Sequence, residues 1–338
     1  MFRELGAFPS KWDDRNIRYA VRAPSYTEIL TVPDEYTALV GIVKCLGNQG
    51  GVGACTGWAG AGLLKTLIKL NDRKDILPSA GFIYAHGKEY VDPPIPFEVE
   101  GSQPIGVLKL LQKVGAPTEG CAVTVTKQPF VLNECSESLS EASKFKIGSY
   151  HFVDVTPAAI KAALYGITYI QPYTMADGSP GKCPVYTTIP VYIGFYTAIA
   201  GVVTYDPTTS TALYGYHQVN IIGWKKINGA DYWVIMNSWG VENGDSGIYY
   251  LPFNYPIIET WLVTDDAPLP NDEPIPPKPE PSPAPPSPVP PTPKPLPPPP
   301  SPAPPKPRCC GRAAAKIMIR AGFTFKRKPR KQEVQYDR

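Results

Sequence analysis

The residue best placed for nucleophilic chemistry in this sequence is Cys55, in the segment NQGGVGACTGWAG. Gly50, Gly51 and Gly53 predict a flexible turn directly before a helix. A thiol in the first turn of a helix faces the positive end of the helix dipole, which favours the thiolate. Free backbone N–H groups at the same place can hold a developing oxyanion. From this segment alone, a buried and inert cysteine remains the alternative.

A thiolate nucleophile needs a general base, and the chain has 3 histidines. The contexts of His86 and His151 favour surface or packing roles. His217 heads an apolar strand in LYGYHQVNIIGW, and a later segment, YWVIMNSWG, places Asn237 just before Trp239. An adjacent antiparallel strand can bring Asn237 beside His217 and leave Trp239 to cover the pair. The amide would then accept the imidazole N–H and fix its tautomer and orientation.

Cysteine usage argues against a metal site. The 7 cysteines are irregularly spaced and form no Cys-x-x-Cys pair. We therefore expect no metal and no cofactor. The first residues contain no apolar run, so no signal peptide is expected, and a reduced, intracellular setting is the default. Cys309 and Cys310 could be lipidated or disulfide-linked, and nothing in the sequence decides between these.

Proline and charge divide the chain. Proline accounts for 42 of the 338 residues, and most of it lies in Pro268–Pro307, which predicts an extended, polyproline-type linker. Residues 308–338 carry 10 Lys and Arg against 2 acidic residues, whereas residues 1–266 have a net charge of −5. The basic run Lys326–Lys331 favours nuclear import or polyanion binding, with a solvated charge run as the alternative. Residues 311–322 could form a short basic amphipathic helix on an anionic surface.

Hydrophobic periodicity predicts helices first and strands afterwards. Helices are expected at residues 56–70, 105–114 and 157–164, the last with Thr156 as N-cap. Strands are expected at residues 189–205, 216–226, 231–237 and 247–251, with a hairpin turn at Asn228-Gly229. The uncharged run 183–205 has the composition of a strand broken by turns rather than that of a membrane helix. This order indicates an α+β fold.

Three segments, in the chain order Cys, His, Asn, resemble the papain family of cysteine peptidases. Gln49–Cys55 matches the family's Q-G-x-x-G-x-C, and His217–Trp224 resembles its H-A-V-x-x-V-G-Y. Asn237–Gly240 is the family's N-S-W-G intact, and the following GDSGIYYLP is similar to a motif of its prokaryotic members. With weaker agreement between the motifs, the resemblance covers about residues 32–255.

The departures from the family pattern are informative. The family usually has Cys three residues before the nucleophile and Trp just after it, where this chain has Val52 and Thr56. The usual disulfide beside the nucleophile therefore cannot form, which fits an intracellular protein. The Cys-Thr pair and the segment PSKWDDRN resemble prokaryotic-type and large-virus members. Residues 1–31 are too few for the family's folded inhibitory prodomain. In the family, a second Trp after N-S-W-G forms part of the wall of a substrate subsite. Asn243 stands in its place here, so this wall is altered.

The resemblance implies a role for each matching residue. Cys55 would attack the peptide bond as a thiolate paired with protonated His217, and Asn237 would hold the imidazole under Trp239. The side chain of Gln49 and the backbone N–H of Cys55 would hold the oxyanion. Substrate would add as an extended strand against the pair Gly101 and Ser102, with Pro104 and Tyr216 at the main specificity pocket. For Pro104, packing at a helix start is the alternative.

The resemblance also implies a two-lobed fold, with a helical left lobe and an antiparallel, β-barrel-like right lobe. We divide the chain into an N-terminal arm (residues 1–31), a peptidase domain (32–265), a Pro-rich linker (266–307) and a basic tail (308–338). Within the domain, the helical lobe covers about residues 46–125 and the β lobe about 126–265. The disordered Pro-rich tail follows.

The expected function is that of a cysteine endopeptidase acting on proteins or peptides, located in the cytoplasm or nucleus or associated with a virion. The basic tail could tether it to nucleic acid or an anionic membrane surface. The alternative is a papain-like scaffold with altered or lost activity that serves as a structural or virion-associated binding protein.

Overall fold

The computed structural model describes residues 4–11, 32–43, 47–71, 75–124, 126–127, 130–166 and 182–265. The predicted Pro-rich linker, the basic tail, Cys45 and most of the N-terminal arm lie outside these residues. The division of the chain at residues 31, 265 and 307 therefore stays a prediction.

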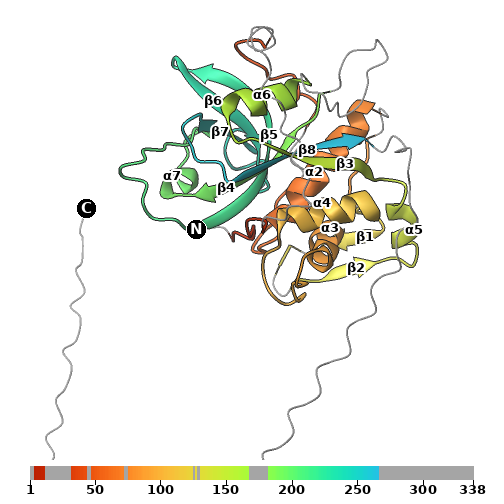
Figure 1. The fold of residues 1–338 in the computed structure, drawn as a ribbon. Helices are drawn as coiled ribbons and strands as arrows, with labels where there is room; N and C mark the ends of the chain where they lie inside the picture. The colour runs from red at the N-terminus through yellow and green to blue at the C-terminus, as the bar shows by residue number, and fades with distance from the viewer. Residues whose placement is uncertain are drawn as a thin grey trace, which may run out of the picture. The chain divides into compact units, whose positions relative to one another are not determined.

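Helices dominate the first half of the described chain (Figure 1). α2 spans Cys55–Asn71, α3 spans Ala80–Gly87, the 3-10 turn η1 spans Lys88–Tyr90 and α4 spans Pro104–Lys113. The first and last of the three α-helices confirm the expected periodicity. Proline suits the first position of α4 because its missing N–H would have no helical partner there. Ser79 caps α3 by accepting the N–H of Phe82, so this helix also has a local start signal.

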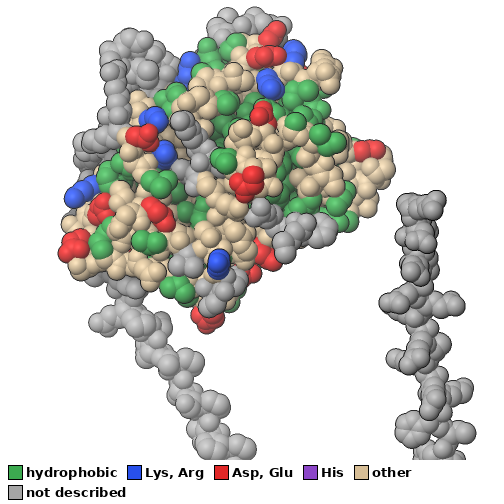
Figure 2. All heavy atoms as spheres, turned by 180° about the vertical axis from the view of Figure 1, so that it is seen from behind, with side chains coloured by type: hydrophobic (Ala, Val, Ile, Leu, Met, Phe, Trp, Pro, Cys, Tyr) green, Lys and Arg blue, Asp and Glu red, His purple; other side chains and the backbone are tan. Residues whose placement is uncertain are grey.

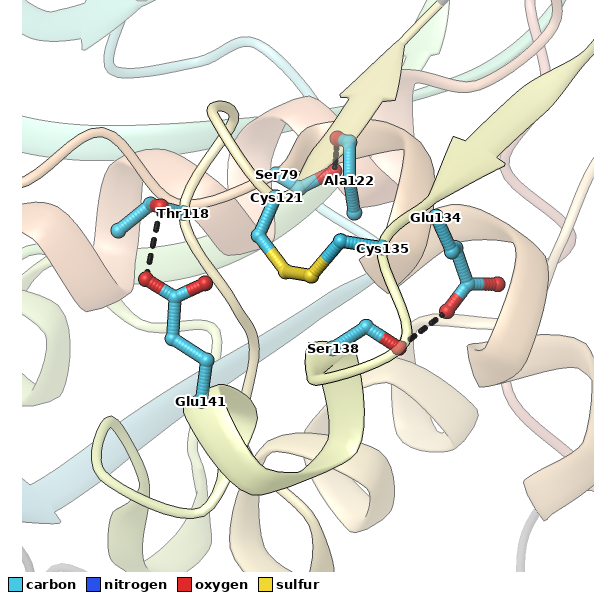
Figure 3. The surroundings of a disulfide bond; sticks show 8 residues. All are labelled: Ser79, Thr118, Cys121, Ala122, Glu134, Cys135, Ser138 and Glu141. Atoms are coloured by element: carbon cyan, nitrogen blue, oxygen red, sulfur yellow. Dashed lines mark hydrogen bonds between the residues drawn. A yellow bond between two sulfur atoms is a disulfide. The ribbon is translucent and has the colours of Figure 1, made fainter.

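A small hairpin and a disulfide close the helical side of the molecule. β1 (Ala122–Thr124) pairs with β2 (Leu132–Glu134), and α5 (Ser138–Ala142) follows. Cys121 and Cys135 form a disulfide across the base of the hairpin (Figure 3). Close to it, the Thr118 hydroxyl donates a hydrogen bond to Glu141, and the Ser138 hydroxyl donates one to Glu134. This disulfide was not predicted from the sequence, because the pairing of cysteines cannot be deduced from their spacing alone.

The second half forms a six-stranded antiparallel sheet with the order β3-β8-β4-β5-β6-β7. Its strands are β3 (Ile147–Val153), β4 (Val185–Val191), β5 (Gly215–Ile227), β6 (Ala230–Met236), β7 (Ile248–Pro252) and β8 (Glu259–Asp265). Asn228 and Gly229 join β5 to β6 with positive φ angles of 51° and 82°, as expected for this turn.

Short helices complete the β side. α6 (Pro157–Tyr165) begins after Thr156, whose side chain caps Ala159 as predicted. The predicted strand 189–205 is wrong beyond Val191, because α7 (Ile193–Tyr196) and a turn follow β4 there. No described helix has the length and apolar character needed to cross a bilayer.

The two halves meet along α2, which packs against the sheet. Asn220 on β5 donates to the Ala59 carbonyl of α2 at 2.8 Å, and Tyr186 on β4 donates to the Thr56 carbonyl at 2.9 Å. The predicted α+β class with a helical part and an antiparallel β part is therefore confirmed (Figure 1). On the face seen in Figure 2, acidic and basic side chains are interspersed, so the described surface there presents no large basic patch.

Candidate active site

Cys55 is the first residue of α2 and lies at the junction of the two halves. Its sulfur accepts a hydrogen bond from the backbone N–H of Gln218 on β5 at 3.4 Å, and the side chain is fully buried. Burial raises the pKa of the Cys55 thiol to about 11, although the backbone N–H groups of Gln218 and Gly6 act in the opposite direction. In this state the thiol form is therefore favoured over the thiolate.

His217 lies on β5 directly before Gln218, whose backbone N–H reaches the Cys55 sulfur, so the backbone of His217 lies close to the nucleophile. The Nε2 atom of His217 and the Oδ1 atom of Asn237 are 2.7 Å apart. The other ring nitrogen, Nδ1, is buried and has no hydrogen-bond partner among the residues that the structure describes. The Asn237 bond thus leaves Nδ1 available for a proton exchanged with the thiol. Burial lowers the pKa of His217 to about 4, while the Asn237 bond acts to raise it.

Aromatic rings enclose the His217–Asn237 pair. The Trp239 ring centroid lies 5.1 Å from that of His217, and the Phe195 ring centroid lies 5.9 Å from it. Phe195 also stacks on Tyr249 at 5.0 Å. These rings exclude water from the imidazole–amide bond, which strengthens it by lowering the local dielectric. The Trp239 ring therefore lies against the imidazole, and its supporting role in catalysis stays a prediction.

Gln49 approaches the nucleophile from the loop before α2. Its Nε2 donates to the carbonyl oxygens of Val52 at 2.9 Å and Glu4 at 3.1 Å. Its Oε1 accepts the hydroxyl proton of Ser238 at 2.6 Å, which fixes the direction of the amide. The donor predicted to hold an oxyanion is therefore engaged by a backbone carbonyl of the N-terminal segment, which we define as residues 4–11.

The N-terminal segment lies along the residues predicted to bind substrate. The Ser102 N–H donates to the Gly6 carbonyl at 2.8 Å, and the Phe8 N–H donates to the Ser102 carbonyl at 2.9 Å, which makes a parallel bridge. The Ala7 N–H donates to the Tyr216 carbonyl at 3.3 Å. Ser102 and Tyr216 thus bind the same extended backbone from opposite sides.

The segment continues to the start of α4. Ser10 accepts the Ile105 N–H on its hydroxyl at 3.1 Å and donates its own N–H to a Glu259 carboxylate oxygen at 3.0 Å. Pro104, the first residue of α4, is buried directly before Ile105. Glu259 was not predicted as a site residue, because its position inside a strand gives no local signal in the sequence, and no contacts were predicted for residues 4–11.

The wall of the groove at Gly101 has a buried support. Gly101 adopts a φ of 95°, and its N–H donates to the Tyr84 hydroxyl at 2.9 Å. Lys88, only 1 % exposed, donates to the Phe97 carbonyl at 3.0 Å and to the Val99 carbonyl, with its ammonium 4.3 Å from the Tyr84 ring. Burial lowers the pKa of Lys88 to about 8. Lys88 and Tyr84 therefore fix the segment that leads into Ser102.

The remaining histidines lie away from this corner. His86 bonds Glu89 and Glu134, and buried His151 lies 2.7 Å from the Ser149 hydroxyl. Within the described ranges, no group of three His, Cys, Asp or Glu side chains could hold a metal ion.

Comparison with protein families gives one matching model, described as papain family cysteine protease, over residues 40–255. The chain is 27% identical over 227 residues to cathepsin B-like cysteine proteinase 3 of Caenorhabditis elegans, covering 61% of this chain and 56% of that protein. It is 30% identical over 155 residues to the gut-specific cysteine proteinase of the same organism, covering 44% of this chain and 46% of that protein. The chain thus spans about half the length of these curated relatives.

Solved structures share the fold. Xylellain, a cysteine protease from Xylella fastidiosa, superposes with a TM-score of 0.58 at 20% identity over 78% of this chain and 98% of its own. Procathepsin B S9 from Trypanosoma congolense gives a TM-score of 0.56 at 16% identity over 77% of this chain and 85% of its own.

Proposed function

Because the chain belongs to the papain family of cysteine proteases, we propose that it is an endopeptidase that cleaves peptide bonds through a thioester on Cys55. The observation that carries the proposal is the buried corner in which the Cys55 sulfur meets the β5 backbone beside His217, while Asn237 holds Nε2 at 2.7 Å. This arrangement leaves Nδ1 of His217 as the ring atom able to exchange a proton with the sulfur.

In the proposed reaction, the Cys55 thiol gives its proton to His217 Nδ1 and the sulfur attacks the substrate carbonyl carbon. The oxyanion is held by the Gln49 side chain and the Cys55 N–H, and the loss of one such donor typically costs about 3 kcal/mol of transition-state stabilisation. His217 then protonates the leaving amine. A water molecule, deprotonated by His217, finally hydrolyses the thioester. Asn237 keeps the imidazole in the required tautomer throughout.

The proposed substrate is an extended peptide that replaces the N-terminal segment. The backbone hydrogen bonds from the segment to Ser102 and Tyr216 support a groove in which both walls bind the backbone of a peptide rather than its side chains. Gly101 and Ser102 form one wall, and Pro104 and Tyr216 flank the main pocket. We expect Tyr216 to narrow this pocket, so that small or slender apolar residues are preferred. Profiling with a peptide library tests this, and a preference for bulky aromatic residues would refute it.

The same contacts make the described state a closed one. The segment covers the fully buried Cys55, and it presents the Gly6 N–H, rather than a carbonyl carbon, to the sulfur. It also occupies the Gln49 donor. We therefore propose that residues 4–11 must leave the groove before peptide can bind.

The basic tail and the location of the protein remain separate proposals. Residues 308–338 would tether the enzyme to nucleic acid or an anionic membrane, so deleting them should weaken a salt-sensitive association without slowing cleavage. An intracellular setting, with virion association as an option, stays a prediction. The Cys121–Cys135 disulfide argues against this intracellular setting, because disulfides are rare in reducing compartments.

One labelling experiment separates peptidase activity from the alternative of an inactive, structural or virion-associated binding protein. An epoxide inhibitor of papain-like enzymes should modify the full chain once, at Cys55, and abolish peptide cleavage. Cys55→Ala should remove both the label and the activity. Peptide cleavage that persists in Cys55→Ala would overturn the proposal. So would a folded chain with Cys55 intact that neither cleaves peptide nor reacts with the inhibitor once the N-terminal segment is displaced.

A further inference from the structure

A row of buried polar side chains crosses β8, β4 and β5 and continues to the loop before α2. Its five members, which we call the polar row, are Glu259 on β8, Thr188 on β4, Gln218 on β5, Ser238 after β6 and Gln49. Each is at most 6% exposed. Glu259 begins the row at Ser10, and Gln49 ends it at Glu4, so the row connects the two ends of the N-terminal segment.

Most of the row is joined by short hydrogen bonds. The Thr188 hydroxyl lies 2.9 Å from Glu259 Oε1 and donates to Gln218 Oε1 at 2.6 Å. At the other end, the Ser238 hydroxyl donates to Gln49 Oε1 at 2.6 Å. The register explains the first part, because Glu259 and Gln218 both lie directly opposite Thr188 in the sheet.

The row is interrupted between Gln218 and Ser238. Gln218 Nε2 is buried and has no hydrogen-bond partner within the described part of the chain, although a buried donor is costly to leave unpaired. A cavity of about 10 Å³ lies at this gap. It is lined by Trp58, Ala59, Gln218, Met236, Asn237 and Ser238. This is about the smallest volume that holds one water.

The polar atoms around the cavity suit a water molecule. Gln218 Nε2 can donate to it, and the Ser238 oxygen can accept from it because the Ser238 proton is directed to Gln49. The family motif H-A-V has Ala where this chain has Gln218, so the unpaired amide is a feature of this sequence. An apolar filling would leave the Gln218 donor unsatisfied.

We propose that this cavity binds one ordered water that bridges Gln218 to Ser238, and that Gln218 is thereby a positioning residue. The water completes the polar row next to Asn237, which holds His217, and next to Ser238, which holds Gln49. The base and the oxyanion donor are thus fixed by one buried network. The cavity and the unpaired Gln218 amide are the evidence for the water site. The effect of this water on catalysis rests on the proposed function.

The test compares the full-length wild type with Gln218→Met, which keeps the length of the side chain but removes its polar atoms. Thr187→Val is the matched control, because Thr187 is equally buried on β4 and its hydroxyl bonds only the Val185 carbonyl among the bonds described. High-resolution crystallography reads the water directly. Ring ¹⁵N shifts of His217 read its tautomer and its pKa, and neither measurement requires activity.

The expected result is one water between Gln218 and Ser238 in the wild type and in Thr187→Val, and none in Gln218→Met. The His217 ring shifts should change in Gln218→Met alone. The value of kcat should fall about ten- to hundred-fold with KM nearly unchanged, because the reacting groups lose their fixed geometry. Gln218→Asn, which keeps an amide, should restore part of kcat.

A dry cavity in the wild type would overturn the water site. A water retained in Gln218→Met, or ring shifts identical to those of the wild type, would overturn the positioning role. A folded chain that holds the water and the wild-type His217 shifts, but cleaves no peptide even when Gly6→Ala displaces the N-terminal segment, would refute the proposed function and leave this water site standing.

Discussion

A single methyl group at Gly6 should open the groove. A Cβ added at Gly6 would overlap the carbonyl group of Gly53, which is backbone of the loop before Cys55 and cannot rotate away. Gly6→Ala should therefore displace the N-terminal segment. The three backbone bonds that join residues 6–8 to Ser102 and Tyr216 would be lost with it.

The magnitude follows from those bonds. At about 1 kcal/mol of net stability each, three bonds amount to about 3 kcal/mol. Since every 1.4 kcal/mol is a factor of about ten, the open population should rise about 100-fold. The rate at which an epoxide inhibitor labels Cys55 should rise by the same factor, as should peptide cleavage at low substrate concentration.

The assay measures the labelling rate by mass spectrometry in the full chain at neutral pH. Gly41→Ala is the matched control, because an added Cβ there meets no atom within 4 Å. Circular dichroism checks that both variants stay folded. If Gly6→Ala labels no faster than Gly41→Ala while both are folded, the segment does not control access to Cys55 and the reasoning fails.

Three further predictions follow from the buried groups. Burial lowers the pKa of both His217 and His151 to about 4, so the unfolded chain alone takes up these protons between about pH 6.5 and 4. Stability should fall by up to about 3 kcal/mol for His217 as the pH drops through that range, with a further loss from His151; urea titrations at several pH values measure this, and a flat profile contradicts it. The double variant Cys121→Ser, Cys135→Ser should lose about 3 kcal/mol of stability, because the disulfide closes a loop with a sequence separation of 14. A reductant should destabilise the wild type but not the variant. If the reductant lowers the stability of both proteins equally, the disulfide is absent. Lys88→Met should leave the Phe97 and Val99 carbonyls without their donor and loosen the wall that leads to Ser102, so that KM rises about tenfold more than kcat falls. The control Lys226→Met, at an exposed site, should change neither constant. An unchanged KM in Lys88→Met would show that Lys88 does not support the groove.

The parts of the fold that the sequence predicted are those with a strong local signal. α2 and α4 have apolar residues at helical spacing, and Asn228-Gly229 has the φ preferences of a hairpin turn. The strand expected at 189–205 was wrong beyond Val191 because β-branched and aromatic residues there pack in α7 and in a turn instead. Composition alone does not distinguish these outcomes.

The candidate site divides in the same way. Cys55, His217 and Asn237 lie in motifs whose chain order implies one corner. The structure places Asn237 beside His217, and the Cys55 sulfur against the backbone N–H of the next residue, Gln218, while their catalytic roles stay a prediction. Glu259 and the N-terminal segment could not be predicted, because their roles depend on which residues lie opposite in space. Ser10 and Glu259 are separated by nearly the whole domain, and only the register of β8 against β4 brings this carboxylate to the groove.

The central claim is that Cys55 carries the acyl group of the substrate during turnover. Mass spectrometry of the Gly6→Ala chain, quenched in acid while it hydrolyses a peptide ester, tests this most directly. The account predicts an added acyl mass on the peptide that contains Cys55, lost on treatment with hydroxylamine and absent when Cys55 is changed to Ala. Turnover with no acyl group on Cys55, or with the group on another residue, would contradict it.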